Sequence, residues 1–468
     1  MKHRGHGRVR RWPEIQEQVV EPNAVDDQSR CVRARSKYLD GALFGGTTNV
    51  GLTMTDFTGS PLTLLSLVIV LSFVGAILSD KIKASYTTVM IAIGLALSFL
   101  RIAGGLSGIV LDRSVILGLV VPPLIFEAAM RTRFETFRTV QKTVLSLAIF
   151  GVVISAVVSA LVLNVVLGVP LAVALMFGVI VSPTDPVSVV NVLKRVQAPE
   201  RLTTILESEA YFNNATPVIL YPIAVSLSFS PLQDLSLFAY TLGGGVAVGL
   251  LVSGVAEVLH RMITEPLAET SFTIAVMFGS YVFAESLGVS GLIAVPIAGL
   301  YMGNRTMRTA MSEETRTTMT KFWEVVTFMA TSFAFLLLGL KADFGLLVAY
   351  LPFIIAAFGA ILVARILSVY PIVGFTRLLG ERIPHSWTRV LAFAGLRGAV
   401  SVALALSLPE SGFKDAVVAM TFGVALLSLI VQAELLQTYL KTVKLSESIR
   451  DSRHAMEAAR GRFEVSSM

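Results

Sequence analysis

One acidic residue lies between two prolines inside a strongly apolar stretch of the chain. In "VSPTDPVSVV", Pro183 and Pro186 flank Thr184 and Asp185. Each proline removes a backbone donor and clashes with the preceding turn, so we expect a helix to unwind near Asp185. A carboxylate in low-dielectric surroundings favours neutralisation, which either a proton or a cation can provide. Thr184 and the carbonyls freed by the break would add neutral oxygens, which suit a hard cation such as Na⁺, so this stretch predicts a site where a cation and a proton compete. The alternative, an aspartate that only caps a helix, fits a position so deep in an apolar block less well.

A second polar stretch, "ESEAYFNNATPVILYP" from Glu207 to Pro222, also interrupts an apolar block. It holds the acid Glu209 and two adjacent amides, Asn213 and Asn214. Polar groups inside a membrane are costly and usually functional, so we expect these side chains to face the protein interior.

Glu127, in "VPPLIFEAAM", is a further acid next to an apolar block. Two interpretations are open. Glu127 can serve the ion site, or it can pair with Arg131 at the membrane surface, because the chain turns basic a few residues later.

The composition identifies the class of protein. The chain has 468 residues, of which 54% are hydrophobic and 15% charged, with a mean hydropathy of +0.74. A soluble domain would hold about a quarter charged residues. The apolar residues come in blocks of about twenty, the length of a membrane-spanning helix. We therefore predict an all-α polytopic membrane protein.

Thirteen apolar blocks follow a polar N-terminal region. Residues 1–60 are polar and predicted to be a disordered tail, with Met54 as an alternative start; residues 61–440 form the transmembrane domain; and 441–468 form a short cytoplasmic tail. The blocks lie near 62–79, 86–103, 114–130, 143–167, 170–195, 203–228, 233–259, 269–287, 289–303, 322–341, 345–374, 387–408 and 414–440.

Several function classes are disfavoured. The net charge of +6 comes from short loops between apolar blocks and does not indicate nucleic-acid binding. We find no phosphate-binding loop of the G-x-x-x-x-G-K-[ST] type, so a nucleotide-driven pump is not expected. The single cysteine, Cys31, allows no internal disulfide, and we predict no cofactor. The five histidines are expected on solvated surface.

Orientation is predicted from the basic residues of the short loops, because these stay in the cytoplasm. One set of loops holds seventeen Lys and Arg, from Lys81 to Arg389, and the alternate set holds four. We therefore expect a cell-membrane protein with its N-terminus outside and its C-terminus in the cytoplasm.

A second interrupted block contains "AGLRGAVSVALAL", in which Gly395 and Gly398 flank Arg397 and favour local unwinding. This block is seven positions after the block of Asp185, so each break lies in the fifth block of a half. Matching breaks in two halves indicate an inverted repeat with a binding site near the membrane midplane.

These motifs also carry a resemblance. "SPTDPV", "ESEAYFNNAT", "PPLIFEA" and "GLRGAVSVALAL" resemble the sodium/proton exchanger branch of the monovalent cation/proton antiporters, in order and spacing from about residue 62 to 440. The resemblance implies a homodimer in the lipid bilayer. It also implies a six-helix transport bundle with two crossed broken helices, which moves to expose one ion site to alternate sides.

The resemblance assigns roles to charged residues. It places Glu127 close to the ion site on a neighbouring helix, and it makes Glu209 the partner of an arginine. Arg365, well inside the eleventh block, is our candidate, and a buried pair of this kind is structural. Arg397 would supply positive charge between the crossed breaks, where half-helix ends concentrate partial charges.

The chain departs from the family pattern at Asn214. The matching motif reads Asn-Asp, and its aspartate is the main cation-binding and proton-carrying acid; Ala210 likewise replaces the usual serine. Asp185, with Glu127, can then carry exchange alone, or the ion preference has shifted, for example to K⁺/H⁺ exchange. The remaining alternative is a transport-inactive relative that acts as a sensor or scaffold. We expect Na⁺/H⁺ (or Li⁺/H⁺) antiport at Asp185, Thr184, Asn213 and Asn214, and we disfavour a channel.

Overall fold

The computed structural model describes residues 61–99, 115–226, 230–263 and 265–442. Within these ranges the chain forms helices and no strands, as an all-α protein should. The predicted tail at 1–60, residues 443–468 of the C-terminal tail, Cys31 and Met54 lie outside the described residues.

Helices correspond to all thirteen apolar blocks. The first half contains α3 (Pro61–Ile82), α4 (Tyr86–Phe99), η2 (Ile116–Val120), α6 (Val121–Arg131), α7 (Phe134–Arg138), α8 (Gln141–Ser146), η3 (Leu147–Gly151), α9 (Val152–Leu167), α10 (Leu171–Val181), α11 (Pro186–Val196), α12 (Glu200–Asn213) and α13 (Ala215–Ser226). The second half contains α14 (Pro231–His260), α15 (Pro266–Ser286), α16 (Gly291–Tyr301), η4 (Met302–Thr306), α17 (Met307–Thr309), α18 (Glu313–Lys341), α19 (Phe344–Ala349), α20 (Leu351–Leu378), α21 (His385–Phe393), α22 (Ala399–Leu406), α23 (Lys414–Leu427) and η5 (Ser428–Gln432).

The structure supports a multi-pass membrane protein. Among the described residues, six helices are long and apolar enough to cross a membrane, and a seventh span is the bent pair formed by α10 and α11. The bend between these two helices is 50°. The full number of thirteen crossings, and the inverted repeat, stay predictions.

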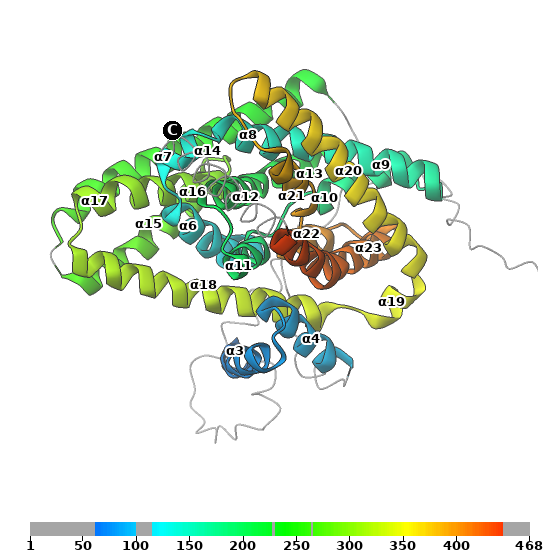
Figure 1. Cartoon of the computed structure of the whole chain (residues 1–468), viewed down its shortest axis with the longest axis horizontal. Helices are drawn as coiled ribbons and strands as arrows, with labels where there is room; N and C mark the ends of the chain where they lie inside the picture. Colours follow the sequence, from blue (N-terminus) through cyan, green and yellow to red (C-terminus); the bar gives the residue numbers. More distant parts are fainter. Residues whose placement is uncertain (1–60, 100–114, 227–229, 264, 443–468) are drawn as a thin grey trace, which may run out of the picture.

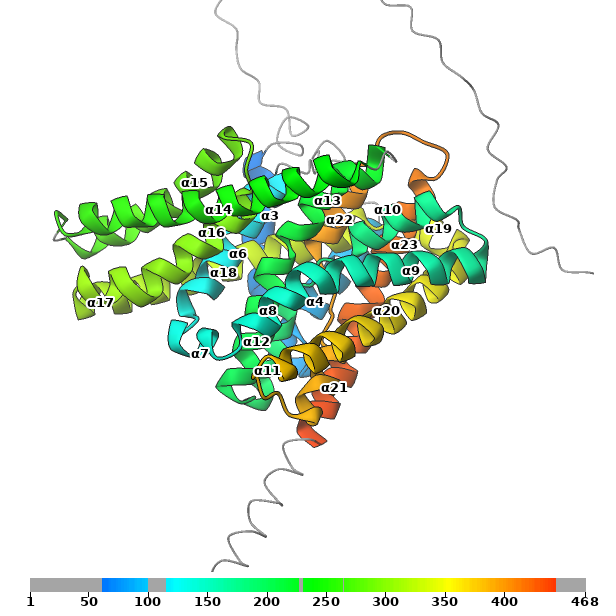
Figure 2. The same ribbon diagram turned by 90° about the horizontal axis from the view of Figure 1, so that it is seen from above.

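Two groups of helices are visible in Figure 2. Helices α14, α15 and α16 pack on one another and extend to one side, whereas α9, α20 and α23 pack together with α10, the first half of the bent pair. Helix α18 runs along the molecule and carries α4 on its surface (Figure 1).

Glycine allows α4 and α18 to touch through their backbones. A Cβ atom placed on Gly94 would lie 2.9 Å from the Cα atom of Gly339, and any larger residue would push the helices apart. Small residues at such crossings are a common way for membrane helices to associate, since they gain close van der Waals contact.

One sequence expectation about the histidines is wrong. His260 was expected on solvated surface, but the structure buries it completely at the end of α14. Its ring packs on Phe272, and Nδ1 lies 2.9 Å from the carbonyl oxygen of Ala256. A position close to a helix end therefore did not mean exposure to solvent.

Candidate ion-binding site

The two interrupted helices meet at their breaks. The backbone N–H of Asp185, between α10 and α11, donates a hydrogen bond of 2.8 Å to the carbonyl of Leu396, between α21 and α22. A Cβ atom on Gly398 would lie 2.7 Å from Cβ of Asp185, so only glycine permits this approach. The prolines and glycines of the two motifs thus create unwound segments that lie directly against each other.

Asp185 is the N-cap of α11. Its Oδ2 atom accepts a hydrogen bond of 2.7 Å from the backbone N–H of Ser188, and the residue is only 7% exposed. The capping role considered for Asp185 is therefore present in the structure. Oδ1 faces the backbone of Gly398 and takes no part in the cap, so capping leaves one carboxylate oxygen for another ligand.

Thr184 and Asn213 hold each other. The Asn213 side chain donates from Nδ2 to Thr184 Oγ1 at 2.8 Å and accepts at Oδ1 from the Thr184 backbone N–H at 3.3 Å. This pair fixes the end of α12 against the break after α10. Both residues are buried, so their oxygens lie in a dry environment next to Asp185.

Asn214 behaves differently from its neighbour. It is 1% exposed, and neither Oδ1 nor Nδ2 has a hydrogen-bond partner within the described part of the chain. An unsatisfied buried amide costs free energy, so such groups are rare unless a ligand or water completes them. The unpaired Asn214 side chain therefore indicates a place that something else fills.

A small cavity lies beside these polar groups. Its volume is about 20 Å³, and its lining includes Thr184, Asp185, Asn214 and Gly398. A cavity needs about 10–15 Å³ to hold one water molecule. There is accordingly room for one water molecule or one small cation next to the Asp185 carboxylate.

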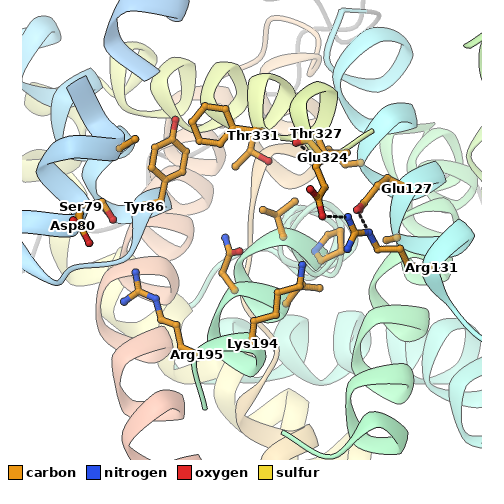
Figure 3. A pocket seen from close by; sticks show the side chains of 18 of the residues that line it. Ser79, Asp80, Tyr86, Glu127, Arg131, Lys194, Arg195, Glu324, Thr327 and Thr331 are labelled. Carbon is orange, nitrogen blue, oxygen red and sulfur yellow. Dashed lines mark hydrogen bonds and ion pairs between the residues drawn. The ribbon is translucent and has the colours of Figure 1, made fainter. Parts of the chain in front are cut away.

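Glu127 lines a different and larger cavity of about 800 Å³ (Figure 3). There it forms an ion pair with Arg131, whose Nη2 atom also donates to Glu324 Oε1 at 2.8 Å. The pairing with Arg131 that the sequence left open is thus present, and Glu127 does not line the small cavity. The two cavities share Leu124 and Pro186, so the larger one leads to the wall of the site.

Sequence reasoning missed several residues of the larger cavity. Glu324 comes from α18, far along the chain, whereas Val187, Val190, Asn191 and Lys194 come from one side of α11. Val187 is three and four positions before Val190 and Asn191, which are four and three positions before Lys194, and this is the spacing of one helix face. That periodicity was visible in "DPVSVVNVLK", but the contribution of Glu324 was not.

Two buried arginines neutralise the C-terminal ends of half-helices. Arg397 donates from Nη1 to the carbonyls of Ser182 and Pro183, just after α10. Arg365 donates from Nε to the carbonyl of Leu391 in the last turn of α21, at 3.2 Å. Helix C-termini carry partial negative charge, so a guanidinium group stabilises each of them.

Arg365 also binds Glu209, the partner expected from the sequence. Its Nη1 and Nη2 atoms lie 2.5 and 2.8 Å from the two carboxylate oxygens, and both side chains are almost completely buried. A bidentate pair of this kind fixes geometry as well as charge. It joins α12 to α20, and the second contact of Arg365 joins both to α21.

Comparison with known proteins identifies the chain. The family model described as "Sodium/hydrogen exchanger, transmembrane" matches residues 68–442. The chain belongs to the sodium/hydrogen exchanger family. This is a family of transporters and not of enzymes.

Curated relatives of this exchanger include two proteins that are named as Na⁺/H⁺ antiporters. It is 31% identical over 374 residues to the low-affinity Na⁺/H⁺ antiporter NhaS1 of Synechocystis, covering 78% of this chain and 70% of NhaS1. It is 34% identical over 369 residues to the Na⁺/H⁺ antiporter ApNhaP of Aphanothece halophytica, covering 77% and 70% of the two chains.

A solved structure has a similar fold. The sodium proton antiporter MjNhaP1 from Methanocaldococcus jannaschii at pH 8 superposes with a TM-score of 0.67 and 24% identity. The match covers 81% of this chain and 97% of MjNhaP1. The exchanger therefore has the MjNhaP1 type of fold.

The buried pair of this exchanger predicts a stability effect. Glu209→Gln leaves the Arg365 guanidinium in the interior without its counter-charge, so we expect a loss of about 3–5 kcal/mol. Thermal unfolding of the purified protein in detergent measures the change. The matched control is Glu313→Gln, because Glu313 pairs with Arg316 at 3.0 Å on the surface and is 83% exposed. Equal melting temperatures for the two variants would contradict a structural role of Glu209.

Proposed function

We propose that this protein exchanges Na⁺ for H⁺ across the membrane by alternating access, with Asp185 as the carboxylate for which the two ions compete. The observation that carries the proposal is a buried carboxylate beside an unpaired buried amide, in a space for one small ion, where two broken helices meet. Membership of the sodium/hydrogen exchanger family supports Na⁺ and H⁺ as the two exchanged ions.

The physical basis of exchange is the cost of a bare charge. An ionised carboxylate in the membrane interior is unfavourable unless a cation or a proton neutralises it. Asp185 Oδ1 would bind the cation, with neutral oxygens from Thr184, Asn213 and Asn214 around it. Since one carboxylate cannot hold both ions, each must leave before the other binds. The two fluxes are coupled because the empty site, a bare carboxylate, does not cross in this proposal.

The larger cavity supports a path to the site from one side. Its lining carries charges of both signs, with the acids Asp80, Glu127 and Glu324 and the bases Lys83, Arg131, Lys194 and Arg195. A cation that enters would pass the Glu127–Arg131–Glu324 cluster (Figure 3) and reach Pro186, which also lines the small cavity beside Asp185. In this proposal Glu127 attracts cations towards the site and does not bind them there.

Asn214 is the position at which we propose a difference from other exchangers. Where the family motif has an aspartate, this site has a neutral amide, and Ala210 replaces a serine. The unpaired Oδ1 of Asn214 keeps an oxygen ligand but no charge. Exchange then depends on Asp185 alone.

The neutral amide also leaves two alternatives to Na⁺/H⁺ exchange. The second candidate function is a transport-inactive relative that senses ions, and a further option is exchange of K⁺ in place of Na⁺.

A direct test uses purified protein in vesicles with an imposed pH gradient. We expect Na⁺ or Li⁺ to dissipate the gradient, whereas choline, which is too large for a cavity of about 20 Å³, has no effect. A response to K⁺ alone would indicate altered ion preference. No response to any of the three cations would favour the inactive relative.

We also propose a homodimer in which α14 and α15 face the partner or lipid. Helix α14 is the least buried of the membrane-spanning candidates, and its outer side carries Leu235, Leu251, Val255 and Val258. Exposed apolar surface of this extent is stable only against lipid or another protein.

The orientation can be tested by cysteine labelling. In a Cys31→Ser background, Glu410→Cys should react with a membrane-impermeant maleimide in intact cells, whereas Thr139→Cys should react only after permeabilisation. Both positions are exposed, and they belong to the sparsely and densely basic sets of loops, respectively. The reverse pattern would place the C-terminus outside.

A further inference from the structure

A second large cavity lies away from the proposed ion site. Its volume is about 660 Å³, and it separates α14 and α16 from α8, η3 and α12. The walls are mainly apolar and come from both groups of helices, with Ile149 and Phe212 on one side and Val246, Ile293 and Ile297 on the other. The ion path described above does not use any of these residues.

One end of this cavity is polar. Tyr301, Asn304 and Arg305 lie there, together with Glu135 from α7. The side chains of Arg305 and Glu135 are more than half exposed, so this end opens to solvent. Ile149 and Val246 of the apolar walls belong to helical stretches long enough to cross a bilayer, Gln141–Leu167 and Leu232–His260. The cavity thus combines a polar end with apolar walls, as a phospholipid combines a polar headgroup with apolar acyl chains.

The charged end holds an excess of one positive charge. Glu257 is the common partner of Arg261 and Arg305, at 2.9 and 2.8 Å, so one carboxylate serves two guanidinium groups. Glu135 gives no compensation because Arg308 already neutralises it at 2.9 Å. A single phosphate beside Arg305 would balance the cluster through charge-assisted hydrogen bonds.

We propose that this cavity binds one phospholipid with a singly negative headgroup. An acyl chain lies along Val246, Ile293 and Ile297, and the phosphate contacts Arg305 at the membrane surface. Basic residues at that depth attract anionic lipid headgroups. The lipid would lie between the two helix groups and fill the space that separates them. This inference goes beyond the proposed ion exchange and does not depend on it.

The test measures lipid binding and not transport. Full-length protein in detergent is stripped of lipid, titrated with phosphatidylglycerol, and followed by native mass spectrometry and by its melting temperature. We expect one tightly held phosphatidylglycerol and a higher melting temperature, because a ligand that binds only the folded state stabilises it. Phosphatidylcholine should bind more weakly, by about tenfold, if the excess charge at Arg305 selects the headgroup.

Two variants and two matched controls locate the lipid. Val246→Phe fills the apolar part, and Arg305→Gln removes the excess charge while Arg261 keeps Glu257 paired. Leu251→Phe adds the same bulk on the outer side of α14, where the side chain is 58% exposed. Arg382→Gln removes another loop arginine that does not line this cavity.

The two variants should lose the bound phosphatidylglycerol, and the two controls should keep it. Equal affinity for phosphatidylglycerol and phosphatidylcholine would overturn the proposal. So would full stabilisation by inorganic phosphate alone, since no acyl chain would then be needed. If Val246→Phe fails to fold, Arg305→Gln and the comparison of lipids on the native protein still decide the question.

Discussion

Asp185→Asn is expected to reduce cation/proton exchange to the rate of protein-free vesicles. Among the described residues, Asp185 is the one acidic side chain that lines the small cavity, so in the variant neither a proton nor a cation would have a charge to neutralise. Folding should survive, because asparagine caps a helix about as well as aspartate and the hydrogen bond from Ser188 can be kept. The measurement is dissipation of a pH gradient upon addition of Na⁺ or Li⁺.

The structure offers a matched control for this variant. Asp343 is also an N-cap aspartate, and it accepts a hydrogen bond of 3.0 Å from the backbone N–H of Leu346 at the start of α19. Asp343→Asn makes the same chemical change away from the broken helices and should leave exchange intact. If Asp185→Asn exchanges ions as fast as this control, Asp185 is not the competing carboxylate.

Asn214→Asp is expected to produce the largest gain. The two side chains are nearly equal in size, and neither polar atom of Asn214 has a partner to lose. An additional carboxylate in the membrane interior costs about 2.5–3.5 kcal/mol, and a bound cation or proton would remove that cost. We therefore expect stronger Na⁺ or Li⁺ affinity than in the native protein, or exchange where the native protein shows none. The assay is a pH jump in vesicles over a series of cation concentrations.

Asn191→Asp is the control for a general effect of negative charge. Asn191 lines the larger cavity and not the small one, so a carboxylate there changes the potential of the path without adding a ligand at the site. Its cation affinity should stay close to native. If the native protein exchanges rapidly and Asn214→Asp slows it, the amide is a working part of the site, and the interpretation of Asn214 as a lost charge is wrong.

Local physical signals predicted much of the architecture. Apolar blocks long enough to span a bilayer predicted helices, and the prolines around Asp185 and the glycines around Arg397 predicted where two of them break. These signals are encoded in short stretches of sequence. The Glu209–Arg365 pair followed from the resemblance, since residues 156 positions apart carry no local sign that they touch.

Contacts between distant segments explain what the sequence did not predict. The partners of Arg131 lie on α6 and α18, so nothing near Glu127 indicated that a second acid, Glu324, shares its arginine. The reciprocal bonds of Thr184 and Asn213 and the unpaired state of Asn214 depend on how α12 meets the first break. Adjacent asparagines look alike in the sequence, and only the packing distinguishes them.

The buried charges around the crossed helices have an electrical consequence. Asp185 and Glu209 are matched in number by Arg365 and Arg397, so with both acids ionised these four residues have no net charge. Binding of Na⁺ or H⁺ then makes the group positive by one unit. Moving one elementary charge across a membrane potential of 100 mV changes the energy by about 2.3 kcal/mol. A negative cytoplasm would therefore pull the loaded site inward, whereas the membrane potential would exert no net force on the empty site. With an aspartate at position 214, the empty site would carry one negative charge and the loaded site none. The membrane potential would then act on the empty site and not on the loaded one.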